Sequence, residues 1–245
     1  MKIYNLGFIS DEKIYEHVKE TVLKYQRKID IEQFNKNIID PIKLTFDARV
    51  YGKTFEEIIE SECIRQIDKS NTNHIGYFHQ NLFKLAGNGW EVPEHGFDII
   101  NSQRKIYVEM KNKHNTMNAS SSQATYMAMQ QQLLHEPDAN CYLVEVIAKH
   151  SQNIVWEGSF KGVHLSDNRI RRMSIDKFYE IVFNDKYAFY KLCKALPFIL
   201  DDVVRETNTG KIENTVYDEL RQISPETLKS LYLLAFSTYE GFNLD

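Results

Sequence analysis

Three ionisable residues are spaced so that two carboxylates and one ammonium group could share a site. Glu109 and Lys111 belong to a run of alternating apolar and polar residues at 105–111, and Asp98 lies upstream. Because successive side chains of a strand point to opposite faces, this run predicts a half-buried strand with Glu109 and Lys111 on one face. The opposite face would carry the apolar side chains Ile106, Val108 and Met110.

A second strand at 96–100 and a polar turn at 101–104 would bring Asp98 across from Glu109 in a hairpin. Two carboxylates that close repel each other unless a divalent cation lies between them. Mg²⁺ binds such oxygens and neutralises charge on a reacting phosphate, and a neighbouring lysine can orient the attacking water. The pattern therefore predicts metal-dependent phosphodiester hydrolysis. A surface strand with a Glu–Lys pair fits the same spacing.

Composition limits the alternatives. The chain has 245 residues, 42% of them hydrophobic, and few Gly or Pro residues that could form a linker, so we expect one domain over residues 1–245. The start resembles no secretory signal and no apolar stretch is long enough to span a membrane, which predicts a cytoplasmic protein. Cys63, Cys141 and Cys193 lack metal-site spacing and are expected as buried thiols. The net charge of −4 argues modestly against a nucleic-acid partner.

The elements from residue 75 follow the order helix, strand, strand, strand, helix, strand. We expect helices at 56–67 and 75–85 with a polar loop at 68–73 between them, and a further helix at 120–134. Strands are expected at 90–92, 96–100, 105–111 and 141–147. Three strands in a meander and a helical crossover predict an α/β fold, with a mixed central sheet flanked by helices. Residues 75–160 would form its catalytic core, 1–74 a helical N-terminal part that includes a helical stretch at 10–40, and 161–245 a mainly helical C-terminal part.

This order, with an acid on the second strand and Glu-x-Lys on the third, resembles the PD-(D/E)XK nucleases. The motif stands here as Gly96-Phe97-Asp98 and Glu109-Met110-Lys111, with Phe97 in place of the usual proline. The resemblance implies that Asp98 and Glu109 hold Mg²⁺, with the Met110 carbonyl as a further ligand, and that Lys111 positions the water. Gln80 occupies the place of a further acid on the preceding helix, and it brings no charge.

A closer resemblance covers residues 5–205. The block from Tyr107 to Asn118, the segment from Asn37 to Phe46 and the basic segment from Arg169 to Arg172 are similar to type II restriction endonucleases that cut GGNCC sites. The resemblance implies a sequence-specific endonuclease of double-stranded DNA with a DNA methyltransferase as its genetic partner. A repair or junction-resolving nuclease, and a DNA-binding protein of this fold that does not cut, are the alternatives.

Two expectations about binding follow. A nearly palindromic site on two strands is matched by a homodimer with twofold symmetry, and the helical segments before residue 75 and after about 174 would supply its interface. Polar residues beyond the catalytic strand and a later basic cluster are candidate contacts to phosphates or base edges, although a polar turn or surface decoration fits them too. These candidates are Asn112, Lys113, His114, Asn115, Asn118, Gln123, Arg169, Arg171 and Arg172.

Overall fold

The computed structural model describes residues 3–114, 116–160, 162–208 and 212–239. They form two compact units, which we describe separately. The sheet unit comprises Met1–Leu23 and Ile75–Thr207, and the helical unit comprises Lys24–His74 and Asn208–Asp245. Among the described helices, none is long and apolar enough to cross a membrane.

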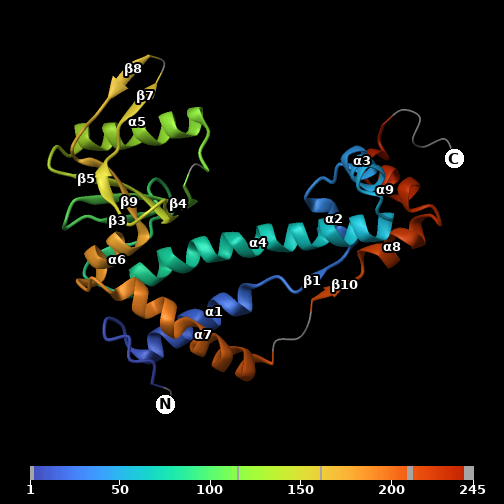
Figure 1. Ribbon diagram of the computed structural model, residues 1–245, viewed down its shortest axis with the longest axis horizontal. Coiled ribbons are helices and arrows are strands. Elements are labelled where there is room, and N and C mark those ends of the chain that lie inside the picture. The colour runs from blue at the N-terminus through green and yellow to red at the C-terminus, as the bar shows by residue number, and fades with distance from the viewer. Residues whose placement is uncertain (1–2, 115, 161, 209–211, 240–245) are drawn as a thin grey trace. The chain divides into compact units, whose positions relative to one another are not determined.

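A six-stranded mixed sheet forms the centre of the sheet unit (Figure 1). Its strand order is β2-β3-β4-β5-β9-β6, in which β2, β3 and β4 form an antiparallel meander and β4, β5 and β9 run parallel. A parallel neighbour requires a crossover, and helix α5 (Ala119–His135) provides it between β4 and β5. The strands are β2 (Trp90–Glu91), β3 (Ile99–Asn101), β4 (Ile106–Lys113), β5 (Asn140–Ile147), β6 (Asn153–Val155) and β9 (Ile170–Ser174).

The two faces of this sheet pack against different helices. Ile106, Val108 and Met110 of β4 join a core cluster with residues of α1 (Asp11–Lys24), α4 (Phe55–Leu85), α6 (Ile175–Phe183) and α7 (Ala188–Thr207). On the other face Tyr126, Met129 and Leu133 of α5 pack with residues of β5 and β9. The alternating burial along β4 confirms the two-faced strand that its sequence predicts. A short hairpin, β7 (Gly158–Phe160) and β8 (Val163–Leu165), forms a separate sheet.

The helical unit has its own core. It comprises α2 (Ile31–Lys36), α3 (Pro41–Tyr51), α8 (Val216–Ile223), α9 (Thr227–Phe236), the first part of α4, and a parallel pair of β1 (Lys28–Ile29) and β10 (Glu213–Asn214). Phe34, Ile59 and Leu231 lie in its fully buried cluster. Asp40 caps α3 by accepting a hydrogen bond from the Lys43 amide, and Gly52 ends that helix in the left-handed region at φ 63°.

The mixed sheet flanked by helices and the element order from residue 75 are confirmed, and two local expectations are wrong. The stretch 68–73 is not a loop, because α4 runs without a break from Phe55 to Leu85. It contains neither Gly nor Pro, so nothing in the stretch interrupts the helix. Its polar side chains are exposed or partly exposed on the helix surface. The helical stretch at 10–40 breaks into α1, β1 and α2. The C-terminal part, although mainly helical, also contributes strand β9, which lies in the sheet between β5 and the edge strand β6.

Candidate active site

The hairpin of β3 and β4 brings the two predicted carboxylates together. Ile99 pairs with Val108 in antiparallel register, and continuing that register by one step places Asp98 opposite Glu109. Asp98 lies just before β3, and its Oδ2 accepts a hydrogen bond from the Met110 amide at 2.7 Å. The Asp98 carboxylate thus accepts the hydrogen bond that the backbone of a longer β3 would accept from Met110, and this bond fixes it beside the β4 backbone.

Lys111 completes the group on the same face of β4. Its Nζ donates a hydrogen bond of 2.7 Å to Oε1 of Glu109, and both side chains remain partly exposed. Burial raises the pKa of Glu109 above its usual value, the Lys111 hydrogen bond opposes this shift, and the negative charge of Asp98 adds to it. A positive charge bound next to the two carboxylates would stabilise their ionised forms, so the raised pKa of Glu109 fits a cation-binding site.

The residues present fit a hard divalent cation. Among the described residues no group of three or more His, Cys, Asp or Glu side chains is placed to hold a metal ion. Mg²⁺ needs no such group, because it keeps several waters and is bound in enzymes by one or two carboxylates together with substrate phosphates. The N–H and C=O groups of one strand residue point to the same neighbouring strand, so the Met110 carbonyl faces the side on which Asp98 binds its amide.

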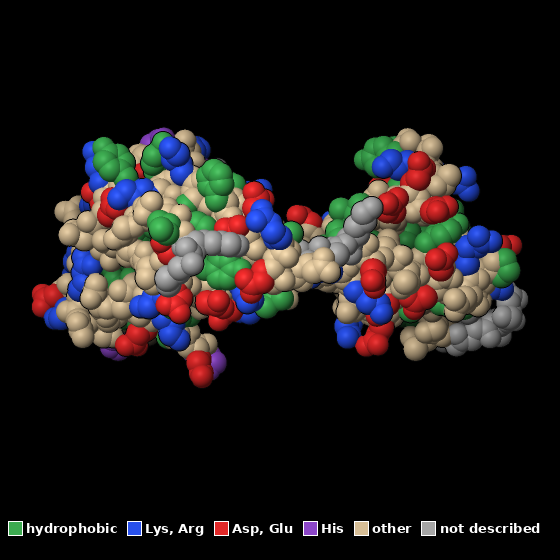
Figure 2. All heavy atoms as spheres, turned by 90° about the horizontal axis from the view of Figure 1, so that it is seen from below, with side chains coloured by type: hydrophobic (Ala, Val, Ile, Leu, Met, Phe, Trp, Pro, Cys, Tyr) green, Lys and Arg blue, Asp and Glu red, His purple; other side chains and the backbone are tan. Residues whose placement is uncertain are grey.

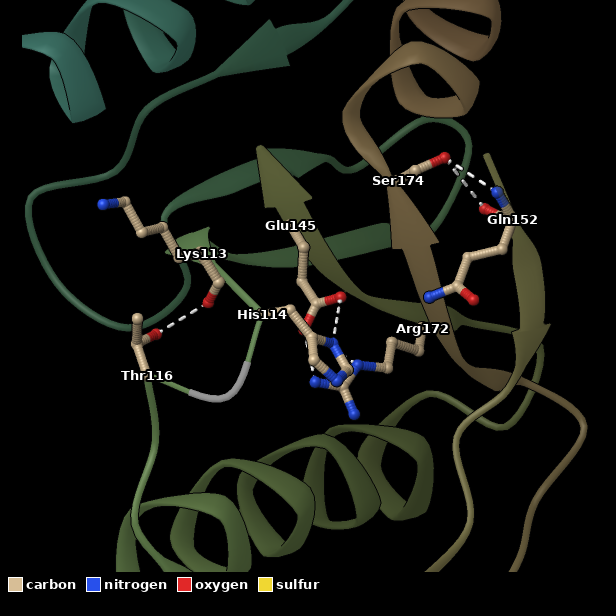
Figure 3. A network of polar contacts seen from close by, with 7 residues as sticks. All are labelled: Lys113, His114, Thr116, Glu145, Gln152, Arg172 and Ser174. Atoms are coloured by element: carbon tan, nitrogen blue, oxygen red, sulfur yellow. Dashed lines mark hydrogen bonds and ion pairs between the residues drawn. The ribbon is translucent and has the colours of Figure 1, made fainter. Parts of the chain in front are cut away.

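A buried carboxylate that the sequence analysis missed lies next to this group. Glu145 on β5 pairs in register with Lys111 on β4 and is only 1% exposed. Figure 3 shows the His114 and Arg172 side chains converging on it from the end of β4 and from β9. The almost wholly apolar run at 141–147 predicted a central strand, and a glutamate inside such a run is the signal that could have identified it.

Comparison with known proteins agrees with this geometry. The family model described as Eco47II restriction endonuclease matches residues 6–205. The chain is 32% identical to the type II restriction enzyme Sau96I of Staphylococcus aureus, over 84% of this chain and 83% of that protein. It is 30% identical to the type II restriction enzyme Eco47II of Escherichia coli, over 82% and 89% of the two chains. The chain belongs to the Eco47II restriction endonuclease family.

This membership confirms the resemblance to type II restriction endonucleases and makes the protein one of them, a site-specific deoxyribonuclease. Enzymes of this kind generally use a divalent metal. The match includes the whole of the six-stranded sheet, and with it Asp98, Glu109 and Lys111.

The three arginines of this restriction endonuclease do not form one cluster. Arg171 and Arg172 are neighbours on β9 and therefore point to opposite faces of the sheet. Arg171 donates hydrogen bonds to the side chain and backbone of Asn153, on the edge strand β6. Arg169 binds both carboxylate oxygens of Asp167 and the Pro137 carbonyl. Only Arg172 shares the face of Glu109 and Lys111.

The candidates beyond β4 divide in a similar way. Asn118 caps α5 by accepting a hydrogen bond from the Ser121 amide, which gives it a structural role. The side chain of Lys113 is exposed and points away from Glu145 in Figure 3. Asn112 and Gln123 are partly exposed, and Asn115 lies outside the described residues.

Gln80 is buried on α4. The C-terminal part of this helix packs its apolar side chains into the core cluster that contains Val108 and Met110, whereas Glu109 and Lys111 point to the other face of β4. Among the described residues no hydrogen bond joins Gln80 to Asp98 or Glu109, so a role for Gln80 in the site stays a prediction.

Proposed function

We propose that this restriction endonuclease hydrolyses phosphodiester bonds with Mg²⁺ held by Asp98, Glu109 and the Met110 carbonyl, on a core of the PD-(D/E)XK type. The observation that carries the proposal is the placement of Asp98 opposite Glu109, with Lys111 bound to the second carboxylate. The order α4, β2, β3, β4, α5, β5 supports the nuclease core. When bound, Mg²⁺ supplies charge neutralisation at the phosphate.

The chain's own groups have separable tasks. Asp98 is fixed by the Met110 amide, so its free oxygen is oriented before any ligand arrives. Lys111 has three donors, of which one is used by Glu109, and the others are available to a water molecule or a phosphate oxygen. An ammonium at that place stabilises negative charge that develops on the phosphate during attack. Gln80 is proposed as an accessory residue of the site, through its amide.

The DNA contacts are proposed for side chains near the end of β4, near the start of α5 and on β9. Asn112, Lys113, His114, Asn115, Asn118, Gln123, Arg169, Arg171 and Arg172 make up this set. Arginine pairs in bidentate fashion with guanine, and each good contact supplies about 1–3 kcal/mol of discrimination. The recognition site proposed is GGNCC. A DNA methyltransferase that modifies the same site is proposed as the genetic partner, since it would protect the host's own DNA.

A homodimer is proposed because one active site reaches one strand, whereas the site to be cut has two. Support comes from helix α3 of the helical unit. Ile42, Phe46 and Val50 recur every fourth residue on it and are 53%, 66% and 71% exposed, so they form an apolar stripe open to solvent. We name these three residues the α3 stripe.

A charge placed in the α3 stripe tests the dimer. Phe46→Glu should convert a sedimenting dimer into a monomer, because two copies would bury like charges against an apolar partner surface. The matched control is Leu134→Glu on α5, which is also exposed but lies outside the stripe and should leave the dimer intact. A wild-type protein that sediments as a monomer both free and on DNA would refute the dimer.

The function itself is tested by digestion of phage DNA with Mg²⁺ and by sequencing the ends. Discrete fragments with flanking G and C are expected, and Lys111→Ala should bind DNA but cut it several orders of magnitude more slowly, as when other essential catalytic groups are lost. Glu94→Gln removes an exposed carboxylate outside the site and is the control. Ends without a common sequence would instead support a repair or junction-resolving nuclease, and intact DNA a protein that only binds.

A further inference from the structure

Glu145 combines two features that are costly together, a carboxylate charge and nearly complete burial. At 1% exposure it cannot be solvated by water, and an unpaired charge in such a place would be strongly destabilising. Its Oε1 accepts hydrogen bonds from Nε of Arg172 at 2.8 Å and from Nη2 of the same side chain. His114 Nδ1 lies 3.0 Å from both carboxylate oxygens. Two side chains, Arg172 and His114, therefore converge on this buried carboxylate.

Each partner has one nitrogen that is not used in binding Glu145. His114 uses Nδ1 for Glu145, and Arg172 uses Nε and Nη2, so Nε2 of the ring and Nη1 of the guanidinium have no hydrogen bond to the described residues. The two side chains are 17% and 20% exposed, so each presents only an edge to solvent. A carboxylate that holds the Nδ1 side of an imidazole also fixes the direction of Nε2.

These groups lie on the catalytic side of the sheet. Lys111 is the register partner of Glu145, and Leu143 pairs with both Glu109 and Arg172, so all of these side chains point to one face. His114 directly follows β4, where its amide donates a hydrogen bond of 2.8 Å to the Ile147 carbonyl. Two donors of fixed direction, Nε2 of His114 and Nη1 of Arg172, are thus held on the same side of the sheet as the proposed reaction centre.

We infer that Glu145 is a positioning residue that holds His114 and Arg172 as a clamp for a DNA phosphate next to the one that is cut. This inference rests on the proposed function of the site. Phosphate oxygens are recognised by fixed N–H donors, and such contacts set the position of the duplex without reading its sequence. Arg172 binds Glu145 through its Nε and Nη2 groups, so its Nη1 end is the part that remains to reach a phosphate oxygen.

Glu145→Gln distinguishes positioning from simple charge. Removal of a negative charge beside bound DNA should strengthen binding if only Coulomb attraction matters. The clamp predicts the opposite, a loss of about tenfold in affinity, because a charge-assisted contact is replaced by a weaker one and the donors lose their fixed direction. The control is Glu136→Gln, which also removes a hydrogen-bonded carboxylate, the acceptor of the Tyr107 hydroxyl at 2.6 Å. It should leave the affinity unchanged or raise it slightly.

Affinities are measured with EDTA present, so that the duplex stays intact, over a series of salt concentrations. His114→Ala and Arg172→Lys should weaken all duplexes alike, whatever their sequence. In the double variant of His114 and Glu145 the losses should not add, because both remove one clamp. Cut ends produced by Arg172→Lys should keep the wild-type sequence.

The outcomes separate the two proposals. Tighter binding by Glu145→Gln, or near wild-type affinity of a folded His114→Ala protein, overturns the clamp while wild-type cleavage with Mg²⁺ still supports the proposed function. If the DNA ends cut by the Arg172→Lys protein show relaxed specificity at one position, Arg172 reads a base, and its assignment as a phosphate contact is overturned. If Glu145→Gln does not fold, the His114 and Arg172 variants, each with a partly exposed side chain, decide the matter. If the wild type and the Lys111→Ala protein cleave DNA at the same rate, the proposed function of the site is overturned instead.

Discussion

The replacement Asp98→Asn should remove metal binding while leaving the metal-free protein almost as stable as before. The asparagine oxygen can still accept the hydrogen bond from the Met110 amide, which Asp98 accepts at 2.7 Å. A charged acceptor is worth about 1.5–3 kcal/mol and a neutral one about 0.5–1.5 kcal/mol, so the exchange costs about 1 kcal/mol. Loss of the Asp98 charge also relieves repulsion of Glu109, which offsets part of that cost.

The metal contribution is much larger than this difference. A cation that binds only the folded protein stabilises it by about 2.7 kcal/mol at one hundred times its dissociation constant. In proteins of this size 1 kcal/mol corresponds to about 2–4 °C in melting temperature. Saturating Mg²⁺ should therefore raise the melting temperature of the wild type by about 5–11 °C, whereas Asp98→Asn should show a rise of less than about 2 °C.

The assay is thermal unfolding followed by circular dichroism with EDTA and with Mg²⁺. Glu94→Gln serves as the charge-matched control, since its exposed carboxylate lies before β3, and it should keep the full metal response. An Asp98→Asn protein that is stabilised by Mg²⁺ as strongly as the wild type would show that Asp98 is not a ligand. A large loss of stability in EDTA would show instead that the Asp98 charge holds the hairpin together.

Two further predictions concern buried groups outside the site. Burial, with a smaller effect from His17, lowers the pKa of His79 from 6.5 to about 4, so its contribution to folding stability is complete above pH 6.5. Up to about 3 kcal/mol is lost as the pH falls from 6.5 to 4, and His79→Gln should flatten this part of the urea-unfolding profile, whereas a similar replacement of the exposed His135 should not. Among the cysteines, Cys193 is exposed, whereas burial raises the pKa of Cys63 and of Cys141 to about 12. Native alkylation read by mass spectrometry should label Cys193 first, and labelling of Cys141 before it would contradict the fold.

The catalytic hairpin could be predicted because its determinants are local. Alternation at 105–111 fixes which side chains share a face, and a four-residue turn fixes the register that brings Asp98 to Glu109. The helix of residues 119–135 was likewise predicted, at 120–134, from the serines near its start and the proline that follows it, although Asn118 and not a serine caps it. In each case the information lies within about twenty residues of the element that it determines.

Strand β9 and the Glu145 network could not be predicted because their determinants are distant in the sequence. The run Ile170–Ser174 has two adjacent arginines, which argue against a strand inside a sheet. Such a strand becomes plausible only when Asn153 and Glu145 are known to accept their hydrogen bonds. Similarly, the continuity of α4 through residues 68–73 depends on packing at both ends, where Ile67 and Phe78 each lie in a core.

The same distant pairing explains how an acidic protein can be a DNA enzyme. In the face shown in Figure 2, Lys and Arg side chains are interspersed with Asp and Glu, and neither sign forms a large patch. Two of the cations proposed at the DNA also pair with carboxylates of the chain, Arg169 with Asp167 and Arg172 with Glu145. A net charge of −4 therefore says little about affinity, because long-range attraction is not what this arrangement supplies. It supplies donors whose directions are fixed before DNA arrives, and fixed donors lose less entropy on binding than free ones do. Specific recognition by such a protein depends on geometry at a few positions more than on its overall charge.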